Sequence, residues 1–318
     1  MKNIFVIGDY GLDPDDVVQA WLTARLHEEG HINLLGAIAN YSPNYQRAKL
    51  CKDVYDYLGC DVSVGVGTDC NSSHTPRDYE FDFTHASSEF IYSGKALLEN
   101  CLAQSHDNSV TLILQSGLTD IYEAMCEFSD LLVSKLKEVY IMGGAWWEGD
   151  RMIADPKASN NKFDKTLDPQ VVYDFFINNN ISINVFTRHA AYQLSVPKQF
   201  YDHLNNINAV GSYLYRAQSQ SILNPWRMVQ QGTRTLQWFV DVFCEGMPVH
   251  PSVENPWGFV TTLSLYDPFT TVWCMKPGYF DPDTREINGV THAILGGEEY
   301  SGVVDPKRAR GFLERFLY

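Results

Sequence analysis

The sequence predicts an α/β protein with a mostly parallel open sheet, helices on both faces and a ligand site at the carboxyl ends of the strands. Two patterns indicate this fold. Short apolar runs alternate with helix-like segments over residues 3–187, and small or polar residues end most of these runs. The 318 residues are 45% hydrophobic and 20% charged, which is typical of a domain with a sizeable core. Residues 1–318 contain no repeat, low-complexity tract or clear linker, so we expect a single domain.

The expected strands and helices follow from the apolar pattern in chain order. Buried strands are expected at 3–9, 32–40, 61–69, 110–117, 136–146 and 181–187. Helices are expected at 13–30, 45–59, 95–105 and 118–128. The first helix begins with acidic residues, which interact favourably with the positive end of a helix dipole. The segment 200–262 is rich in Gln, Asn, Trp and Tyr and is expected to form a cover of helices and loops over the site.

Charge and cysteine content narrow the classes of partner. A formal net charge of −15 argues against nucleic-acid binding, which needs a basic face, and against attraction to anionic membranes. No stretch of about twenty apolar residues predicts a membrane span. The N-terminal apolar run is too short for a signal peptide. The seven cysteines include no CxxC pair. We therefore expect a cytoplasmic protein that binds neither nucleic acid nor a membrane.

Four aspartates lie within eight residues directly after the first predicted strand: Asp9, Asp13, Asp15 and Asp16. Like charges this close need counter-charge, solvent or protonation, and the nearest cation on the N-terminal side is Lys2. The segment could be a helix start with extra acids in its first turn, or a site for a hard cation such as Ca²⁺ or Mg²⁺. The number of aspartates favours the cation site. The spacing does not fit an EF-hand loop.

The segment VIGDYGLDPDDVVQAW (6–21) resembles the N-terminal signature of the inosine-uridine-type nucleoside hydrolases, an Asp-rich strand-to-helix turn that ends in Asp-Asp. Three further segments resemble motifs of the same family, in the same order. They are LILQSGLTDI (112–121), KEVYIMGGAWWEGD (137–150) and LSLYDPFTTVW (263–273). Together these motifs span nearly the full chain, and the sequence resembles a divergent member of this family.

The resemblance implies calcium-dependent hydrolysis of the N-glycosidic bond of a ribonucleoside to free base and ribose. One Ca²⁺ would be bound by Asp9, Asp16, Asp267 and the backbone carbonyl of Gln115. Asp9 would also be the catalytic residue, because it would accept a proton from the attacking water. Asp15 would bind the ribose 2-hydroxyl. The resemblance further implies a homodimer or homotetramer with a role in nucleoside salvage.

Further substrate contacts carry over with departures from the family pattern. The ribose 5-hydroxyl would face Asp150, where the family has Asn, and Lys162 and Asp164, which flank a Phe where the family has Glu and Asn. Because an insertion precedes this segment, Asn160 or Asn161 could serve instead. Tyr266 replaces a His that purine-preferring members use to protonate the leaving base, which suggests a modified nucleoside as substrate.

The remaining expected contacts are Asn40, Met142 and Trp147. Asn40 could equally be a turn residue, and Trp146 and Trp147 could stack on the base or pack within the fold. His189 is interpreted as structural. Lys162 leaves open a second function, an N-glycosidase acting on nucleotide 5-monophosphates. A third is a non-catalytic nucleoside-binding protein that retains the metal site.

Overall fold

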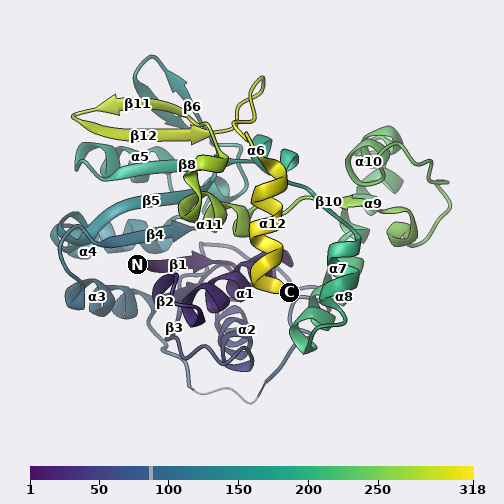
Figure 1. Cartoon of the computed structure of the whole chain (residues 1–318), viewed down its shortest axis with the longest axis horizontal. Coiled ribbons are helices and arrows are strands. Elements are labelled where there is room, and N and C mark those ends of the chain that lie inside the picture. Colours follow the sequence, from purple (N-terminus) through teal and green to yellow (C-terminus); the bar gives the residue numbers. More distant parts are fainter. Residues whose placement is uncertain (86–88) are drawn as a thin grey trace.

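A computed structural model describes residues 1–85 and 89–318 (Figure 1). Its centre is an eight-stranded sheet in the order β11-β12-β8-β5-β4-β1-β2-β3. The strands are β1 (Lys2–Gly8), β2 (Ile32–Ala39), β3 (Val64–Val66), β4 (Val110–Leu114), β5 (Leu136–Gly143), β8 (Ser182–Thr187), β11 (Asp283–Ile287) and β12 (Val290–Leu295). Neighbouring strands are parallel, except that β11 is antiparallel to β12. The predicted α/β fold with a mostly parallel sheet is therefore confirmed.

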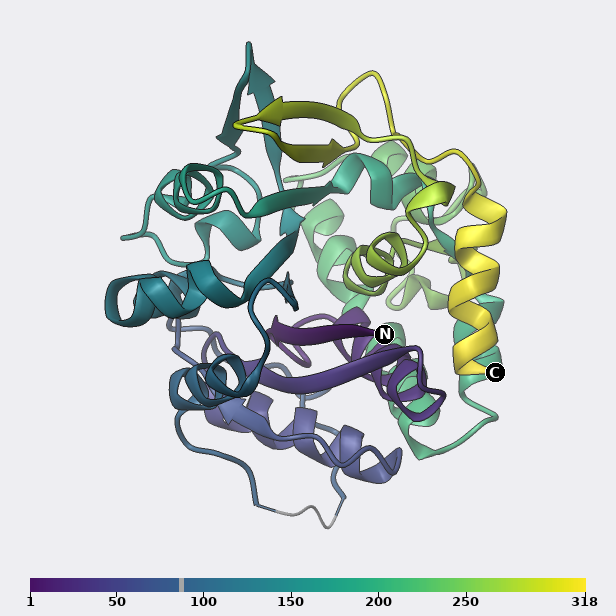
Figure 2. The same cartoon turned by 60° about the vertical axis from the view of Figure 1, so that its left-hand side comes forward.

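Helices cover both faces of the sheet, as parallel crossover connections require (Figures 1 and 2). One face carries α1 (Asp15–Glu28), α2 (Asn44–Tyr57), α11 (Asp267–Met275) and α12 (Pro306–Leu317). The other carries α3 (Gly94–Gln104), α4 (Thr119–Lys135) and α5 (Pro169–Asn178). On the first face, α1 packs against α2, α11 and α12.

Each face of the sheet buries its own apolar core. Successive side chains of a strand point to opposite faces, so Ile4 and Val6 of β1 join one core while Phe5 and Ile7 join the other. Both pairs are almost completely buried. Burial on two sides explains why this strand is a continuous apolar run in the sequence.

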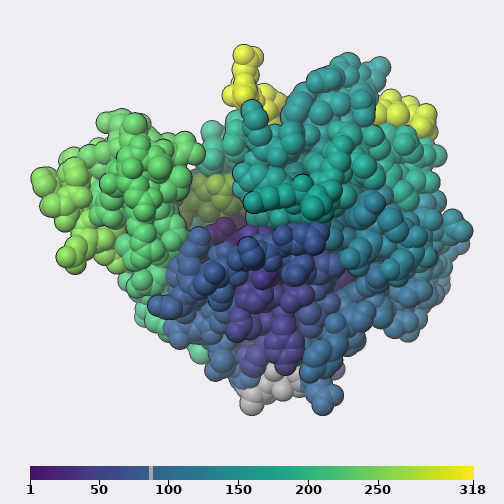
Figure 3. All heavy atoms as spheres, turned by 180° about the vertical axis from the view of Figure 1, so that it is seen from behind, coloured from purple at the N-terminus to yellow at the C-terminus, as the bar shows by residue number. Residues whose placement is uncertain are grey.

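The segment after β8 forms shorter helices beside the sheet. They are α6 (Arg188–Gln193), α7 (Gln199–Leu204), α8 (Ala209–Ser221), α9 (Leu223–Gln230) and α10 (Leu236–Phe243). The helices α9 and α10 lie in a lobe at one side of the molecule (Figures 1 and 3). This lobe has an apolar centre, in which Trp226 packs on Phe239 with ring centroids 4.9 Å apart and its indole donates to the Val253 carbonyl at 2.8 Å.

Several element boundaries differ from those expected. The third strand is reduced to β3, and the helix expected at 118–128 continues to Lys135. The segment 136–146 divides into β5 and the first strand of a hairpin, β6 (Ala145–Glu148) and β7 (Arg151–Ala154). The remaining short elements are β9 (Val196–Pro197), β10 (Thr262–Leu263) and the 3₁₀ turns η1 (Asn160–Lys162), η2 (Pro256–Phe259) and η3 (Pro277–Tyr279). Within the described ranges, none of the helices has the length and apolar content needed to cross a membrane.

Candidate active site

Four nearly buried aspartates meet at the carboxyl edge of the sheet. Asp9 directly follows β1, Asp15 and Asp16 are the first two residues of α1, and Asp267 is the first residue of α11. Because α1 and α11 pack side by side, they bring the N-terminal and C-terminal motifs together. The four residues are only 2–6% exposed.

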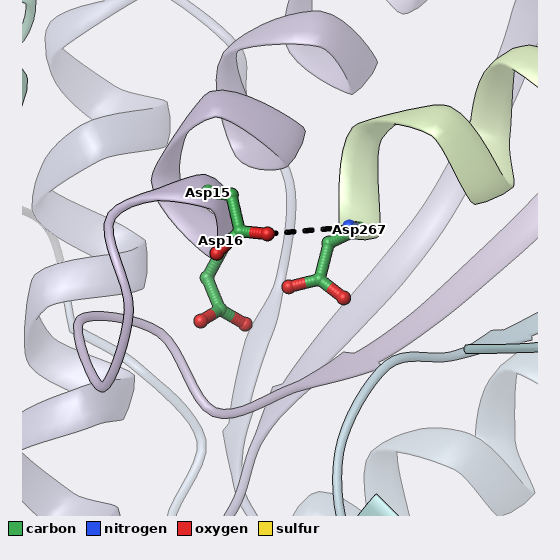
Figure 4. A group of neighbouring side chains, drawn as sticks. All are labelled: Asp15, Asp16 and Asp267. Carbon is green, nitrogen blue, oxygen red and sulfur yellow. Dashed lines mark hydrogen bonds between the residues drawn. The ribbon is translucent and has the colours of Figure 1, made fainter. Parts of the chain in front are cut away.

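Three of these aspartates are arranged so that one ion could contact all of them. Asp15, Asp16 and Asp267 each present a carboxylate oxygen, and the three oxygens lie within 4.8 Å of one another (Figure 4). The Asp15 carboxylate also accepts hydrogen bonds from the backbone N–H of Tyr266 at 2.8 Å and of Asp267 at 3.5 Å. Asp9 is not one of this group, but its backbone N–H donates to Asp16 Oδ1 at 3.2 Å. The sequence-based ligand set had Asp9 in the place that Asp15 takes in this geometry.

Burial makes the ionised form of these carboxylates unfavourable. It raises the pKa of Asp9 and of Asp15 from 3.8 to about 7. Burial, followed by repulsion from Asp9, raises the pKa of Asp16 well above its usual value. Burial and repulsion from Asp15 do the same for Asp267. A cluster of this kind needs either bound protons or a cation.

The nearest counter-charge lies behind the acidic loop rather than among the carboxylates. Arg47 of α2 is fully buried, and its guanidinium donates to the backbone carbonyls of Asp9 and Tyr10 at 3.2 and 3.1 Å. It also pairs with the buried carboxylate of Glu80 at 3.0 Å. Among the described residues, no Lys, Arg or His forms an ion pair with the carboxylates of Asp9, Asp15, Asp16 or Asp267. Arg47 therefore fixes the loop and leaves the carboxylates facing the cavity.

The aspartates form one end of a cavity of about 660 Å³. Predicted site residues that also line it are Gln115, Met142 and Tyr266. Asn160 joins two strand ends at its floor, because its side-chain amide donates to the backbone carbonyls of Gln115 at 2.8 Å and Met142 at 3.1 Å. The cavity therefore lies at the carboxyl ends of β1, β4, β5 and β8, where ligands bind in open α/β sheets.

The structure directs two predicted contacts into the protein interior. The Asn40 amide donates to Asp120 Oδ2 at 2.7 Å. The carboxylate of Asp164 accepts a hydrogen bond from the Thr119 hydroxyl at 3.1 Å and caps its own turn through Thr166. Neither Asn40 nor Asp164 lines the cavity, since these bonds orient both side chains toward neighbouring loops.

Four more predicted contacts lie outside the cavity lining. The Asn161 amide donates to two backbone carbonyls, at 3.0 and 2.9 Å, and so ties neighbouring loops together. Lys162 is exposed at the end of η1, and Asp150 is exposed at the tip of the β6–β7 hairpin. Side chains alternate along β6, so Trp146 lines the cavity while Trp147 points away and its indole donates to β11.

Several cavity residues were not expected from the sequence. Lys157 follows β7, while Arg188, His189 and Tyr192 belong to α6, and all four line the cavity. Arg188 and His189 directly follow β8, so the rule that marks strand ends as site positions could have found them. No residue of the predicted cover 200–262 is among those that line this cavity in the described chain.

The chemistry of the cluster fits a hard cation. Carboxylate and carbonyl oxygens are the ligands preferred by Ca²⁺ and Mg²⁺. The side chain of Gln115 adds a neutral oxygen: its Nε2 donates to the Asp267 carbonyl at 2.6 Å, and its buried Oε1 has no hydrogen-bond partner among the described residues. A buried oxygen without a donor beside three carboxylates is consistent with a cation as the missing partner.

Comparisons with known proteins place the fold. No family model matches the chain, and no curated protein sequence matches it. Among solved structures, the type III effector protein XopQ in complex with adenosine diphosphate ribose is similar, with a TM-score of 0.82 and 25% identity over 99% of this chain and 93% of that one. The effector protein XOO4466 has a TM-score of 0.81 and 24% identity, over 100% and 93% of the two chains.

Nucleoside hydrolases are also among the similar structures. The inosine-uridine preferring nucleoside hydrolase from Bacillus anthracis has a TM-score of 0.63 and 15% identity, over 100% of this chain and 99% of that one. The chain thus has a nucleoside hydrolase-like α/β fold. This agrees with the fold that the sequence motifs imply.

Proposed function

We propose that this protein hydrolyses the N-glycosidic bond of a ribonucleoside, with Ca²⁺ as its cofactor. The observation that carries the proposal is the convergence of Asp9, Asp15, Asp16 and Asp267, nearly buried, at one end of a cavity of about 660 Å³. The nucleoside hydrolases among the structural neighbours support this reaction class. A cytoplasmic homodimer or homotetramer and a role in nucleoside salvage stay predictions.

The proposed cation ligands are carboxylate oxygens of Asp15, Asp16 and Asp267, together with an oxygen of Gln115. When bound, Ca²⁺ would acidify and orient a water molecule and fix the two ribose hydroxyls. Asp9 borders the same cavity but lies outside the three-carboxylate group. Its carboxylate is therefore the group that we assign as the base that accepts the proton of the attacking water.

The remaining residues act on the sugar and on the base. Cleavage of an N-glycosidic bond develops positive charge on the ribose, and buried carboxylates stabilise that charge. Tyr266 and Tyr192 line the cavity with their ring centroids 6.4 Å apart, and together they offer an aromatic surface for the leaving base. Burial raises the pKa of Tyr266 well above 10, so its phenol stays protonated and can donate a hydrogen bond to the base.

A second candidate function is the binding of a nucleotide sugar such as adenosine diphosphate ribose without turnover. The similarity to XopQ, whose structure contains that ligand, favours it. The size of the cavity also favours it, because pockets of about 300–1,000 Å³ accept ligands larger than a nucleoside.

One experiment separates the two candidates. Purified protein is incubated with a panel of normal and modified nucleosides, nucleoside 5-monophosphates and adenosine diphosphate ribose, with Ca²⁺ or with a chelator, and released base is measured. We expect release that requires Ca²⁺ and falls about a hundredfold or more in Asp9→Asn, the usual contribution of a general base. The control Asp150→Asn alters an exposed aspartate outside the cavity and should keep the wild-type rate. Binding of adenosine diphosphate ribose with no base released from any compound would refute hydrolysis and favour the second candidate.

A further inference from the structure

Two cations lie at the rim of the cavity that holds the aspartates. Lys157 follows β7, and Arg188 follows β8 as the first residue of α6. Both side chains are exposed, and neither takes part in an ion pair or a side-chain hydrogen bond with the rest of the described chain. One cavity thus has a negative end and, at its rim, two cationic side chains that are free to bind an anion.

The backbone that carries each cation is fixed to a strand end. Beside Lys157, the Asp155 backbone N–H donates to the Gly144 carbonyl at 2.8 Å. A Cβ on Gly144 would come within 2.9 Å of Asp155 and 2.8 Å of Ala158, so only glycine allows this approach. Beside Arg188, the Thr187 hydroxyl donates to the carbonyl of Gly296 at 2.9 Å.

Two acids share the rim with these cations. Asp155 and Glu298 also line the cavity, so the rim as a whole has little net charge. Asp155 Oδ1 is occupied by the backbone N–H of Lys157 at 2.8 Å, and Glu298 lies exposed after Gly297. Recognition of an anion here therefore depends on directed hydrogen bonds, and the planar guanidinium of Arg188 suits the oxygens of a phosphate.

We propose that Arg188 and Lys157 bind a phosphate group carried by the ribose, so that the ligand of this cavity is a phosphorylated riboside rather than a plain nucleoside. This inference rests on the proposed function, because it assumes that the ribose hydroxyls lie at the aspartates. His189, half-buried beside Arg188, supplies a further donor at the rim. The phosphate then occupies the part of the cavity that a nucleoside leaves empty.

The test uses binding rather than turnover. Calorimetry compares ribose 5-phosphate with ribose, which have no N-glycosidic bond, so the result does not depend on hydrolysis or on the identity of the base. In the wild type we expect the phosphate to strengthen binding about tenfold or more, the effect of a charge-assisted hydrogen bond. Arg188→Gln and Lys157→Gln should each reduce this ratio about fivefold, and the double variant should remove it. Lys165→Gln, which changes an exposed lysine outside the cavity, is the matched control and should keep the ratio.

Further arms make each outcome decisive. Thermal unfolding of every variant shows whether it is folded, and repeating the titrations with a chelator shows whether a cation binds the phosphate. Equal binding of the two sugars by the wild type would overturn the inference. So would a phosphate preference that survives in the double variant, or one that the chelator alone abolishes. Preference for ribose 5-phosphate without release of base from any riboside would refute the proposed hydrolysis and leave the phosphate site standing.

Discussion

Replacement of Arg47 by methionine tests whether the buried guanidinium fixes the acidic loop. Arg47 is fully buried and pairs with the equally buried Glu80 at 3.0 Å. Its other donors bind the backbone carbonyls of Asp9, Tyr10 and Ser42 at 3.1–3.2 Å. Removing one partner of a buried ion pair typically costs about 3–5 kcal/mol, because the other charge remains buried. The three carbonyls lose a charged donor as well.

We therefore expect Arg47→Met to lower the free energy of unfolding by at least about 3 kcal/mol, measured by urea unfolding. The double variant Arg47→Met/Glu80→Leu removes both charges and should recover part of that loss, so the two effects should not add. Arg25→Met is the control. It breaks an exposed pair with Glu28 on the first turn of chain after the same loop's helix, and should change stability by no more than about 0.5 kcal/mol.

The same variant should also weaken cation binding. The carbonyls that Arg47 contacts belong to the loop between β1 and α1, which carries Asp9 and leads into Asp15 and Asp16. Without the guanidinium this loop loses its anchor, so Ca²⁺ affinity measured by calorimetry should fall about tenfold or more. A loss of stability below about 1 kcal/mol, or unchanged Ca²⁺ affinity in the folded variant, would refute the reasoning.

Three further predictions concern other parts of the chain. Asp267→Asn should abolish calorimetric Ca²⁺ binding at a single site while the protein stays folded, and unchanged affinity would remove this residue from the ligand set. In a chelator, the folded state should lose stability as the pH rises from about 4 through 7, because Asp9 and Asp15 have pKa values of about 7 when folded and 3.8 when unfolded; urea unfolding at pH 5 and pH 8 measures this, and greater stability at pH 8 would contradict it. A thiol reagent should modify the exposed Cys126 in the native protein and spare Cys70, whose pKa burial raises to about 12; mass spectrometry of the labelled peptides decides this.

The parts of the fold that depend on local pattern could be predicted from the sequence. The strand β1 is buried on both faces and therefore reads as an unbroken apolar run, and its end marks the position of Asp9. The counter-charge could not be predicted in the same way. Arg47 looks like one cation among several on an amphipathic helix, and only the packing of α2 against the acidic loop reveals that it is buried.

The contacts opposite the aspartates depend on side-chain direction within a single turn. Asn160, Asn161 and Lys162 form the 3₁₀ turn η1, in which successive side chains point about 120° apart. Asn160 therefore faces the cavity, Asn161 is bound to neighbouring loops, and Lys162 is exposed. A sequence comparison that is uncertain by one residue across the preceding insertion cannot choose among these three. Because Asn160 also joins the ends of β4 and β5, substitution of this residue would disturb the strand ends together with any ligand, whereas a change at Lys162 should leave both unaffected.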